Sequence, residues 1–493
     1  MADQSSSTTI PEPDDVPTEP EPEPEPATVP KAATGLQSSV AVPTVNNVLP
    51  QDTNLSAAQL DLNGNLGMAP PMDPTVMVNS FPVNGDTTFM AGVLDPMQAG
   101  ILPMIPAVAP ISADEIALYD RQIRLWGVKA QEKIRSANIL LIGIKGLGNE
   151  IAKNLVLAGV GVLTILDHDP VSADDLGAQF LVTPDKIGQS RAQVAATELQ
   201  KLNPRVQIFS DTDIVFTKMP EYFSSFDITI ATGLPFQALA DINMTCRTFN
   251  RKFYAADTHG MYGFIFADLG IHEFVIEKEK SNRRTRPGDV ETAMRMVISV
   301  SERQENGKTI EIVTKQEQYS PLLLVNSSPL PAEATKTMAK KKKVTPLLAC
   351  LRALLEFQRT NPEGRFPKAT DTKDLMVFAQ LCNQKQLELD LPRESLRADF
   401  LRSFLTNIGS EISPVVAYLG GALAQDVINV LGQREQPLQN FLLFDGENMS
   451  AVTYAIHPNL EALGMLDSNG APMNGTVDGV GADIGMAWTT AAA

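Results

Sequence analysis

The segment NILLIGIKGLGNEIAKNLVLAGV, residues 138–160, constrains the fold of this 493-residue chain more than any other. It begins with a short apolar run of strand length, passes through a glycine-rich turn and continues as an apolar pattern of helical length. As far as residue 258, further strand-like runs alternate with helical patterns. This alternation predicts a parallel sheet with right-handed crossovers, and therefore a Rossmann-like, doubly wound α/β domain.

The α/β pattern is interrupted once and then resumes. Residues 111–280 hold its first part, which ends in two or three predicted antiparallel strands. Residues 281–407 are predicted to form an inserted, mainly helical region. Its helices are expected near residues 345–358, 373–388 and 394–406. Residues 408–460 bring a small-residue helix and two strands, so we expect the insertion to lie between two parts of a single sheet.

Composition changes at both ends of the chain. Residues 1–110 carry 13 acidic residues and one lysine, which account for 12 of the 18 net negative charges, and they are rich in proline. Residues 461–493 are dominated by small and polar residues. Such segments bury too little apolar surface to offset chain entropy. We therefore expect an acidic, proline-rich disordered tail at one end and a second disordered tail at the other.

Charge and hydropathy exclude two classes of partner. Outside the N-terminal tail the chain is only mildly acidic, without the basic field that drives nucleic-acid binding. The apolar stretch at residues 90–111 contains prolines and an aspartate, so it is too broken to span a bilayer. We therefore expect neither nucleic acid nor a membrane as a partner.

The three cysteines, Cys246, Cys350 and Cys382, are widely spaced. This spacing is typical of neither a disulfide framework nor a zinc site, and it indicates a reducing compartment. Each cysteine lies in an apolar or helical context, so we expect burial rather than a role as nucleophile. No metal site is predicted in this chain.

The glycine-rich turn holds the candidate cofactor-binding residues. In nucleotide-binding folds such a turn points the amides of the next helix at phosphate oxygens, and a later acidic residue takes the ribose hydroxyls. Here the glycines are Gly143, Gly146 and Gly148, and the acidic residue is Asp167. Lys145 stands where the backbone would have to approach the phosphates closely. We interpret the segment as a structural turn, while an altered mode of phosphate binding through the lysine stays open.

Several ordered motifs together resemble the ubiquitin-like-protein activating enzymes. They are YDRQIRLWG from Tyr119, GIKGLGNEIAKNLVLAGV from Gly143, LDHDPVSADDLGAQFLV from Leu166, ISPVVAYLGGALAQDVINVLGQ from Ile412 and NFLLFDG from Asn440. The chain is most similar to the smaller, regulatory subunits of SUMO-activating enzymes, over residues 112–276 and 408–457. The resemblance implies a ThiF-like adenylation fold.

The same resemblance shows where groups of a working adenylation site are missing. Family members that bind ATP carry an NLNRQF segment, and DLGAQF stands in its place, so Asp175, Gly177 and Ala178 replace Asn, Asn and Arg. Arg191 replaces the lysine that heads the following helix, and the family's magnesium-binding aspartate has no counterpart after FDITIAT. The cysteines also lack the context of the family's thioester-forming cysteine. The implied site is degenerate, since groups that would neutralise phosphate charge are largely absent.

The resemblance implies that the chemistry lies in a partner. That partner is a catalytic subunit of similar fold, joined through a pseudo-twofold interface, which binds ATP and Mg²⁺ and forms a thioester with SUMO. In this family the first arginine of the YDRQ helix reaches the partner's ATP, which makes Arg121 the expected catalytic residue in trans. Arg124 is expected to pair with a carboxylate on the helix surface. The family also implies nuclear residence, with the cytoplasm as a second location.

Two other functions stay open. One is a Rossmann-type nucleotide-dependent oxidoreductase, although Lys145 and the lack of an obvious proton-transfer residue count against it. The other is a regulatory subunit for another ubiquitin-like modifier. The lysine run Lys340–Lys343 is typical of a solvated loop more often than of a nuclear signal, so it adds little to the expected nuclear residence.

Overall fold

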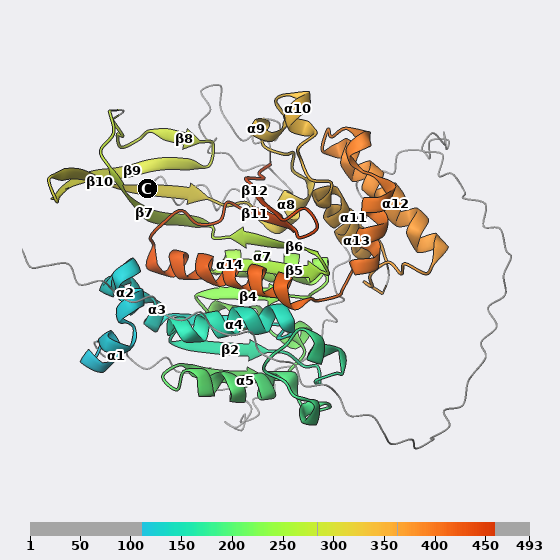
Figure 1. Ribbon diagram of the computed structural model, residues 1–493, viewed down its shortest axis with the longest axis horizontal. Coiled ribbons are helices and arrows are strands. Elements are labelled where there is room, and N and C mark those ends of the chain that lie inside the picture. Colours follow the sequence, from blue (N-terminus) through green and yellow to red (C-terminus); the bar gives the residue numbers. More distant parts are fainter. Residues whose placement is uncertain (1–110, 283, 362, 459–493) are drawn as a thin grey trace, which may run out of the picture. The chain divides into compact units, whose positions relative to one another are not determined.

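The computed structural model describes residues 111–282, 284–361 and 363–458. Its central feature is an eight-stranded sheet with the strand order β12-β11-β6-β5-β4-β1-β2-β3 (Figure 1). The strands from β5 to β3 run parallel, and β6, β11 and β12 continue the sheet in antiparallel fashion. The predicted doubly wound α/β fold is confirmed. Both predicted disordered tails lie outside the described residues.

Every strand of this sheet comes from a run that the sequence predicts. Their bounds are Asn138–Ile142 (β1), Val162–Leu166 (β2), Gln207–Asp211 (β3), Ile228–Thr232 (β4), Lys252–His259 (β5), Tyr262–Asp268 (β6), Phe441–Asp445 (β11) and Ser450–Tyr454 (β12). β1, β2 and β4 consist entirely of buried residues. Such burial is typical of central strands in a parallel sheet that is covered on both faces.

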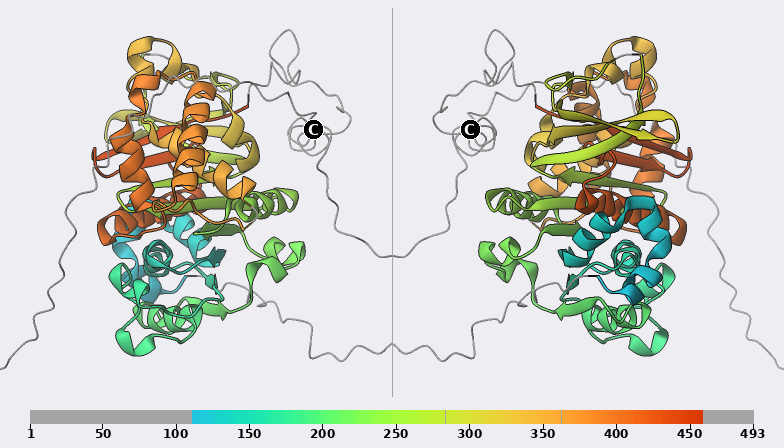
Figure 2. Two further views of the ribbon diagram at one scale, coloured as in Figure 1. Left: turned by 90° about the vertical axis from the view of Figure 1, so that its right-hand side faces the viewer. Right: turned by 90° about the vertical axis from the view of Figure 1, so that its left-hand side faces the viewer.

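Helices cover both faces of the sheet and create two layers of core. One face packs against α3 (Val128–Ser136), α4 (Gly146–Ala158), α5 (Arg191–Leu202) and α14 (Ser413–Gly432). The other packs against α7 (Phe236–Thr248), α8 (Leu322–Ser327) and α11 (Leu347–Thr360). Successive residues of β1 enter opposite layers, since Leu141 lies in the first and Ile142 in the second. The turned views show α14 and α7 on opposite sides of the sheet (Figure 2).

The small-residue helix α14 packs closely on α4. A Cβ atom on Gly420 would lie 2.5 Å from the Cβ atom of Glu150, so only glycine allows this approach. α14 is also the one helix among the described residues that is long and apolar enough to cross a membrane. Its buried positions, including Val416, Leu419 and Leu423, lie in the core beside the sheet. We therefore interpret α14 as a core helix.

Strands, and not helices, form the first part of the region 281–407. β7 (Ile271–Glu279), β10 (Lys308–Gln318), β9 (Arg295–Glu305) and β8 (Val290–Thr292) make a separate antiparallel sheet. The prediction of a mainly helical region is therefore wrong for residues 290–318. Asn306 and Gly307 both have positive φ and form the two-residue turn between β9 and β10. Asn-Gly between alternating apolar residues is a strong hairpin signal, and it outweighs the polar composition of the segment.

Helices fill the region from residue 322 onward. Besides α8 and α11 they include α9 (Ala332–Thr335), α10 (Met338–Lys341), α12 (Thr372–Glu388) and α13 (Ala398–Asn407). α11, α12 and α13 confirm the three helices that the sequence predicts here. Apolar residues of all three join the core on the α7 side of the sheet.

All three cysteines are buried, as expected. Cys246 lies on α7, Cys350 on α11 and Cys382 on α12, and each belongs to the same apolar core. Burial raises the pKa of the Cys246 thiol to about 12. A thiol in such surroundings stays protonated and is a poor nucleophile.

Three short helices precede the sheet: α1 (Ala113–Leu118), α2 (Asp120–Trp126) and α3. A capping box begins α1, since the Glu115 N–H donates to Ser112 Oγ at 3.2 Å and the Ser112 N–H donates to the Glu115 carboxylate at 3.0 Å. A break between α2 and α3 occurs at Gly127, which has a φ of +86°. A further break at Tyr119 turns the side chain of this residue into the body of the domain.

Candidate functional site

A cleft opens at the carboxyl ends of the parallel strands. It has a volume of about 270 Å³ and lies where β1 and β4 adjoin, which is the topological switch point at which doubly wound sheets bind ligands. The turn after β1 contributes Gly143 and Lys145, and Asp167 follows β2. Asp257 of β5 and Glu411 of the loop before α14 add further carboxylates. The predicted turn and the predicted acidic residue thus lie at one site.

Close packing explains each glycine of the turn. Gly143 has a φ of +83°, and a Cβ atom there would lie 2.5 Å from the carbonyl oxygen of Thr232. A Cβ atom on Gly148 would lie 2.2 Å from the carbonyl oxygen of Gly143, and one on Gly146 would lie 3.0 Å from the Cβ atom of Ala178. All of these neighbours belong to the chain itself. The fold therefore needs Gly143 and Gly148 whether or not a nucleotide binds, whereas a Cβ atom at position 146 would ask its neighbours to move only slightly.

The carboxylate of Glu411 binds the N-terminus of α4. Its Oε2 atom accepts a hydrogen bond from the Gly146 N–H at 2.9 Å, and its Oε1 atom accepts one from the Leu147 N–H at 3.0 Å. The first amides of a helix have no partner within it, and they favour an anion. Burial raises the pKa of Glu411, and the two amide hydrogen bonds act against that effect. An internal carboxylate thus contacts the amides that a phosphate-binding turn offers to phosphate.

Asp167 is likewise engaged by the chain itself. Its Oδ2 atom accepts a hydrogen bond from the Ile144 N–H, and its Oδ1 atom accepts one from the Asp169 N–H, both at 2.9 Å. The Nη1 atom of Arg191 lies 3.1 Å and 3.0 Å from the two carboxylate oxygens. The side chains of Arg191 and Asp167 are only 5% and 4% exposed. The residue predicted to hold a ribose therefore holds an arginine of α5.

Arg191 also binds the segment that stands in place of NLNRQF. Its Nε atom donates to Oδ2 of Asp175 at 3.2 Å. The other oxygen of Asp175 accepts from Gln179 at 2.9 Å, and Gln179 in turn accepts from Asn149 of α4 at 2.6 Å. Burial lowers the pKa of Arg191, and the neighbouring carboxylates outweigh that effect and raise it. The guanidinium is the centre of a buried network that joins α5, the Asp175 segment and α4.

An acidic cluster lies beside this network. Asp167, His168 and Asp169 could each offer one atom to a single cation, because these atoms lie within 4.8 Å of one another. Arg191 already pairs with both aspartates, at 3.0 Å and 3.4 Å. The arginine thus supplies the positive charge that the cluster attracts.

Lys145 and Asp257 influence each other across the cleft. Asp257 accepts a hydrogen bond from the Thr258 N–H at 2.8 Å, and burial raises the pKa of its carboxyl to about 6. Lys145 is exposed, and its charge lowers the pKa of both Asp257 and Glu411. The lysine that stands in the turn therefore offsets part of the negative charge of the cleft's own carboxylates.

A nucleotide held as the resemblance implies does not fit these contacts. The amides of α4 bind Glu411, and Asp167 binds Arg191. A triphosphate would have to displace one carboxylate and then lie among others of the same charge, which is unfavourable in a partly buried cleft. The residues present therefore do not suit ATP at this place.

Helix α2 lies at the other end of α4 from this cleft. The Tyr119 hydroxyl is so close to Gly159, just after α4, that a Cβ atom there would lie 2.5 Å from it. Gln122 of α2 donates to the carbonyl oxygen of Leu157 at 3.3 Å. Arg434 also donates to the carbonyl oxygen of Trp126 at 3.0 Å. These contacts fix α2 on the domain although Arg121, Arg124 and Leu125 are exposed and none of its residues is fully buried.

The two arginines of α2 differ in their surroundings. Arg124 lies 2.9 Å from Asp120 in an exposed pair one turn apart, which confirms its expected surface pairing. Arg121 is exposed, and no residue in the described part of the chain forms a hydrogen bond or ion pair with its guanidinium. The guanidinium of Arg121 is therefore not used by the described part of the chain.

Apolar side chains are exposed beside Arg121. Leu118 of α1 is 59% exposed and Leu125 of α2 is 81% exposed. A groove of about 330 Å³ runs next to Leu125 and is lined in part by Trp126 and Ile428. Of the two exposed leucines only Leu125 lines this groove, whose lining also includes the charged residues Glu277, Arg434 and Glu435.

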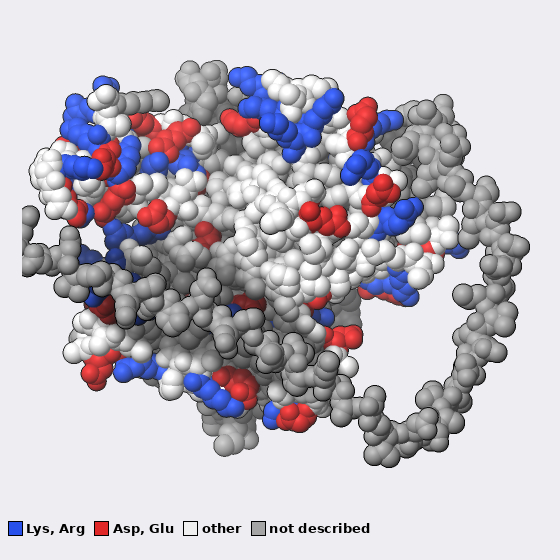
Figure 3. Space-filling model, in the orientation of Figure 1, with Lys and Arg blue, Asp and Glu red and all other residues white. Residues whose placement is uncertain are grey.

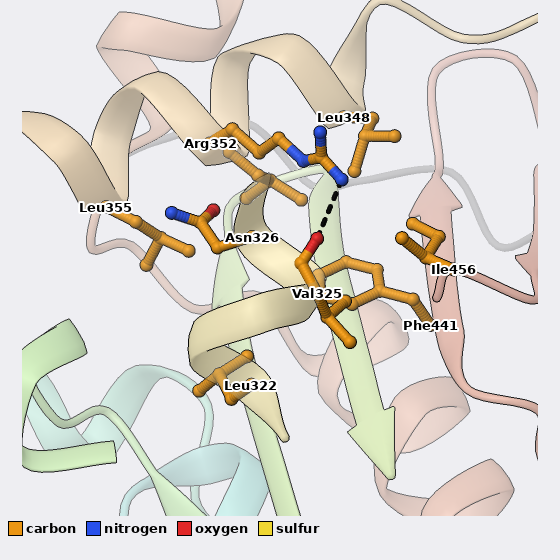
Figure 4. Close-up of a pocket in the computed structure, with 9 residues that line it drawn as sticks. Leu322, Val325, Asn326, Leu348, Arg352, Leu355, Phe441 and Ile456 are labelled. Atoms are coloured by element: carbon orange, nitrogen blue, oxygen red, sulfur yellow. Dashed lines mark hydrogen bonds between the residues drawn. The ribbon is translucent and has the colours of Figure 1, made fainter. Parts of the chain in front are cut away.

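A second cavity, between α8 and α11, is small and structural. Its volume is about 10 Å³, and its lining is largely apolar (Figure 4). Arg352 donates to the carbonyl oxygens of Val325 and Ser328, at 2.8 Å and 2.7 Å. Burial lowers the pKa of Arg352 to about 10. The arginine therefore joins α11 to the end of α8.

The lysine run lies on and just after α10. Lys340, Lys342 and Lys343 are exposed, and Lys341 pairs with Asp390. Blue side chains gather on the surface over this part of the molecule (Figure 3). The run is solvated, as expected, but it begins in a short helix rather than in a loop.

Sequence reasoning missed Glu411, which is the residue that most alters the cleft. It is separated from Gly146 by 265 positions, with the whole insertion between them. Its one local signal is an acidic side chain just before the motif that begins at Ile412. Only the tertiary structure brings it to α4.

Comparison with known proteins agrees with this architecture. The model of the ThiF family matches residues 119–461. The chain is 37% identical over 346 residues to SUMO-activating enzyme subunit 1 of Xenopus laevis, an alignment that covers 70% of this chain and 96% of that protein. It is 36% identical over 350 residues to the human protein of the same name, covering 71% and 97%. It is 38% identical over 345 residues to the DNA damage tolerance protein RHC31 of Saccharomyces cerevisiae, covering 69% and 96%.

Proposed function

The chain belongs to the ThiF family and, within it, to the group of SUMO-activating enzyme subunit 1 proteins, and on that premise we propose that it is the non-catalytic subunit of a heterodimeric SUMO-activating enzyme. The observation that carries this proposal is the near-complete coverage of these relatives, 96% and 97% of their length, at 37% and 36% identity. Similarity over a whole subunit, and not over a nucleotide fold alone, favours the same role in the same reaction.

The complex would use ATP in two steps. The carboxylate of the C-terminal glycine of SUMO attacks the α-phosphorus of ATP, which forms an acyl adenylate and releases pyrophosphate. A cysteine thiolate of the catalytic subunit then attacks the carbonyl carbon, which releases AMP and leaves SUMO as a thioester. Negative charge builds up on the departing pyrophosphate, so groups that offset it accelerate the first step.

In this proposal ATP and Mg²⁺ bind in the catalytic subunit, and this chain forms neither the adenylate nor the thioester. Its own cleft supports that division of labour, since Glu411 contacts the α4 amides and Arg191 contacts Asp167. The burial of the cysteines also argues against a thioester on this chain. What the chain keeps is the sheet and the helices through which two similar domains can pair.

Arg121 would be the direct contribution of this chain to the chemistry. A guanidinium is always charged, and its planar donors match phosphate oxygens, which suits it to stabilise charge on a partner's nucleotide. Two observations support the role: Arg121 is exposed without a partner among the described residues, and exposed leucines lie beside it. Helix α2 is also fixed on the domain, so the arginine would be presented at a defined place.

Nuclear residence is part of the proposal. The exposed lysines Lys340, Lys342 and Lys343 offer a basic surface that an import receptor could bind. Fluorescence microscopy of the tagged chain, with and without alanine at these three positions, tests this. Fluorescence that moves from the nucleus to the cytoplasm in the variant supports the lysine run as a nuclear localisation signal. An unchanged distribution contradicts this role of the lysines.

Reconstitution tests the proposed function as a whole. The purified chain is mixed with a SUMO-activating catalytic subunit, and ATP–pyrophosphate exchange is measured with SUMO, with ubiquitin and without a modifier. We expect exchange that requires both chains and SUMO. Exchange no greater than that of the catalytic subunit alone would contradict the proposal, and exchange driven by ubiquitin would point to another modifier.

A further inference from the structure

We propose that Glu411 is an internal substitute for a phosphate group, whose carboxylate fills the anion site at the start of α4 and holds the turn closed without a nucleotide. The proposal explains why the cleft keeps the shape of a nucleotide site while its residues do not suit ATP. It concerns contacts within this chain, so it does not depend on which modifier the complex activates.

The contacts of Glu411 are those of a ligand of the helix end. Each of its two carboxylate oxygens accepts one amide hydrogen bond, from Gly146 and from Leu147. α4 has 13 residues, and its N-cap residue, Lys145, makes no capping hydrogen bond with its side chain. A carboxylate remote in sequence therefore accepts the hydrogen bonds of the first amides of α4, which at other helices go to a capping side chain or a bound anion.

The shape of the turn favours this approach. A Cβ atom on Gly146 would lie 3.1 Å from Oε2 of Glu411, which is closer than ordinary contacts allow. Gly146 thus leaves room for the carboxylate just as the glycine of a phosphate loop leaves room for phosphate. The glycine that the sequence assigns to cofactor binding is used by the chain's own side chain.

The backbone around Glu411 is anchored, so the carboxylate is always near the amides. The Gly409 N–H donates to Nδ1 of His259 at 3.2 Å, and the Gly260 N–H donates to the carbonyl oxygen of Ser410 at 2.8 Å. A tethered group of this kind has an effective concentration in the millimolar range or above. An external phosphate must compete with that concentration, which lowers its apparent affinity for the same amides.

Removal of the carboxylate should therefore create an anion site. With alanine at position 411 the amides of Gly146 and Leu147 lose their partner, and Lys145 remains nearby with one neighbouring carboxylate, Asp257, instead of two. Unpartnered helix amides beside a lysine attract phosphate or pyrophosphate. The variant is expected to be less stable than the wild type and to regain stability when such an anion binds.

The test uses the full chain and inorganic pyrophosphate as the probe. Thermal unfolding midpoints of the wild type, Glu411→Ala and Glu411→Gln are measured at increasing pyrophosphate concentration. Sodium chloride at matched ionic strength is the reference. Glu394→Ala is the control, because Glu394 is an exposed acidic residue in the turn between α12 and α13. Hydrogen exchange of the Gly146 and Leu147 amides gives a second, local readout.

We expect Glu411→Ala to lower the midpoint by about 2–6 °C, to expose both amides to exchange, and to recover in a saturable way with pyrophosphate. Glu411→Gln keeps the side-chain shape and one strong acceptor, so its unfolding midpoint should lie between those of the wild type and Glu411→Ala. It also remains measurable if the alanine variant fails to fold. The wild type and Glu394→Ala should show no specific response. A saturable response of the wild type, or variants of Glu411 with neither a lower midpoint nor a pyrophosphate response, would overturn the proposal.

Discussion

The cleft at the start of α4 and the helix α2 near its end use their charged groups in opposite ways. In the cleft, Arg191 and Glu411 bind partners within the chain, in buried pairs and on helix amides. On α2, Arg121 is exposed and finds no partner among the described residues, while Arg124 one turn later is paired. A group that the fold already uses contributes to stability, and a group that the fold leaves unused is available to another chain. The comparison separates the structural part of this molecule from its proposed chemical part.

The largest expected effect is on stability and comes from the cleft. Arg191→Ala leaves Asp167 and Asp175 buried without their cation, and loss of one member of a buried ion pair costs about 3–5 kcal/mol. Urea unfolding of the full chain measures this change. Arg359→Ala, which removes an exposed arginine from its pair with the half-buried Glu356, is the control and should cost less than about 1 kcal/mol. Equal effects of the two variants would mean that Arg191 is not the centre of the cleft's network.

The next effect is on activity and comes from α2. Arg121→Ala should lower adenylation by the assembled complex about 10²- to 10³-fold, the order lost when one donor to a transition state is removed, while assembly persists. Pyrophosphate exchange measures turnover, and gel filtration measures assembly. Arg124→Ala and Asp167→Asn are the matched controls from the helix surface and from the cleft, and both should change turnover far less. Unchanged exchange with Arg121→Ala would assign this arginine to structure alone.

A third effect tests the glycine turn as part of the fold. The Cβ atom of Gly148→Ala would meet the carbonyl oxygen of Gly143 at 2.2 Å, so the turn has to shift at a cost of about 1–3 kcal/mol. Thermal unfolding without any nucleotide is the measurement. Gly177→Ala serves as the control, because a Cβ atom there has no neighbour within 4 Å. A stable Gly148→Ala variant would show that the turn is not held by its own packing.

The smallest effect depends on pH. The native pKa of Asp257, about 6, lies above its usual value of 3.8, so the folded state holds the proton more tightly than the unfolded state. The contribution of this group to stability is therefore present in full below pH 3.8 and is lost as pH rises through about 6. Because Asp257 is partly exposed, Asp257→Asn should stabilise the chain by only about 1 kcal/mol at pH 8 and not at all near pH 4. Urea unfolding at both values measures the difference, and the same gain at both would contradict the assignment.

Much of the fold follows from the sequence because its signals are local. The runs that form β1 and β4 are short, apolar and bounded by turns, and helices of expected length separate the strands. The hairpin of β9 and β10 escaped prediction although Asn306-Gly307 is a hairpin signal, because β9 is largely exposed, β10 is mostly half-buried and neither strand has a continuous apolar run. A pattern of apolar residues in the sequence predicts only those elements that bury apolar side chains.

The site is harder to predict because its contacts join distant parts of the chain. The glycines and Asp167 could be found from their spacing, and the structure brings Gly143 and Asp167 to the lining of one cleft, which Gly146 and Gly148 do not join. Two further contacts depend on tertiary packing. Asp167 binds Arg191 because of how α5 packs, and the α4 amides bind Glu411 because of how the loop before α14 packs. Family resemblance indicates which residues have changed, whereas the structure shows which internal partners they have acquired.

We propose that the complex has one working nucleotide site and that this site lies in the catalytic subunit. Equilibrium dialysis of ATP with Mg²⁺ against the assembled complex, and against this chain alone, measures the number of bound nucleotides most directly. We predict one nucleotide per complex and none bound by this chain alone. Two nucleotides per complex, or saturable binding by this chain, would contradict the account.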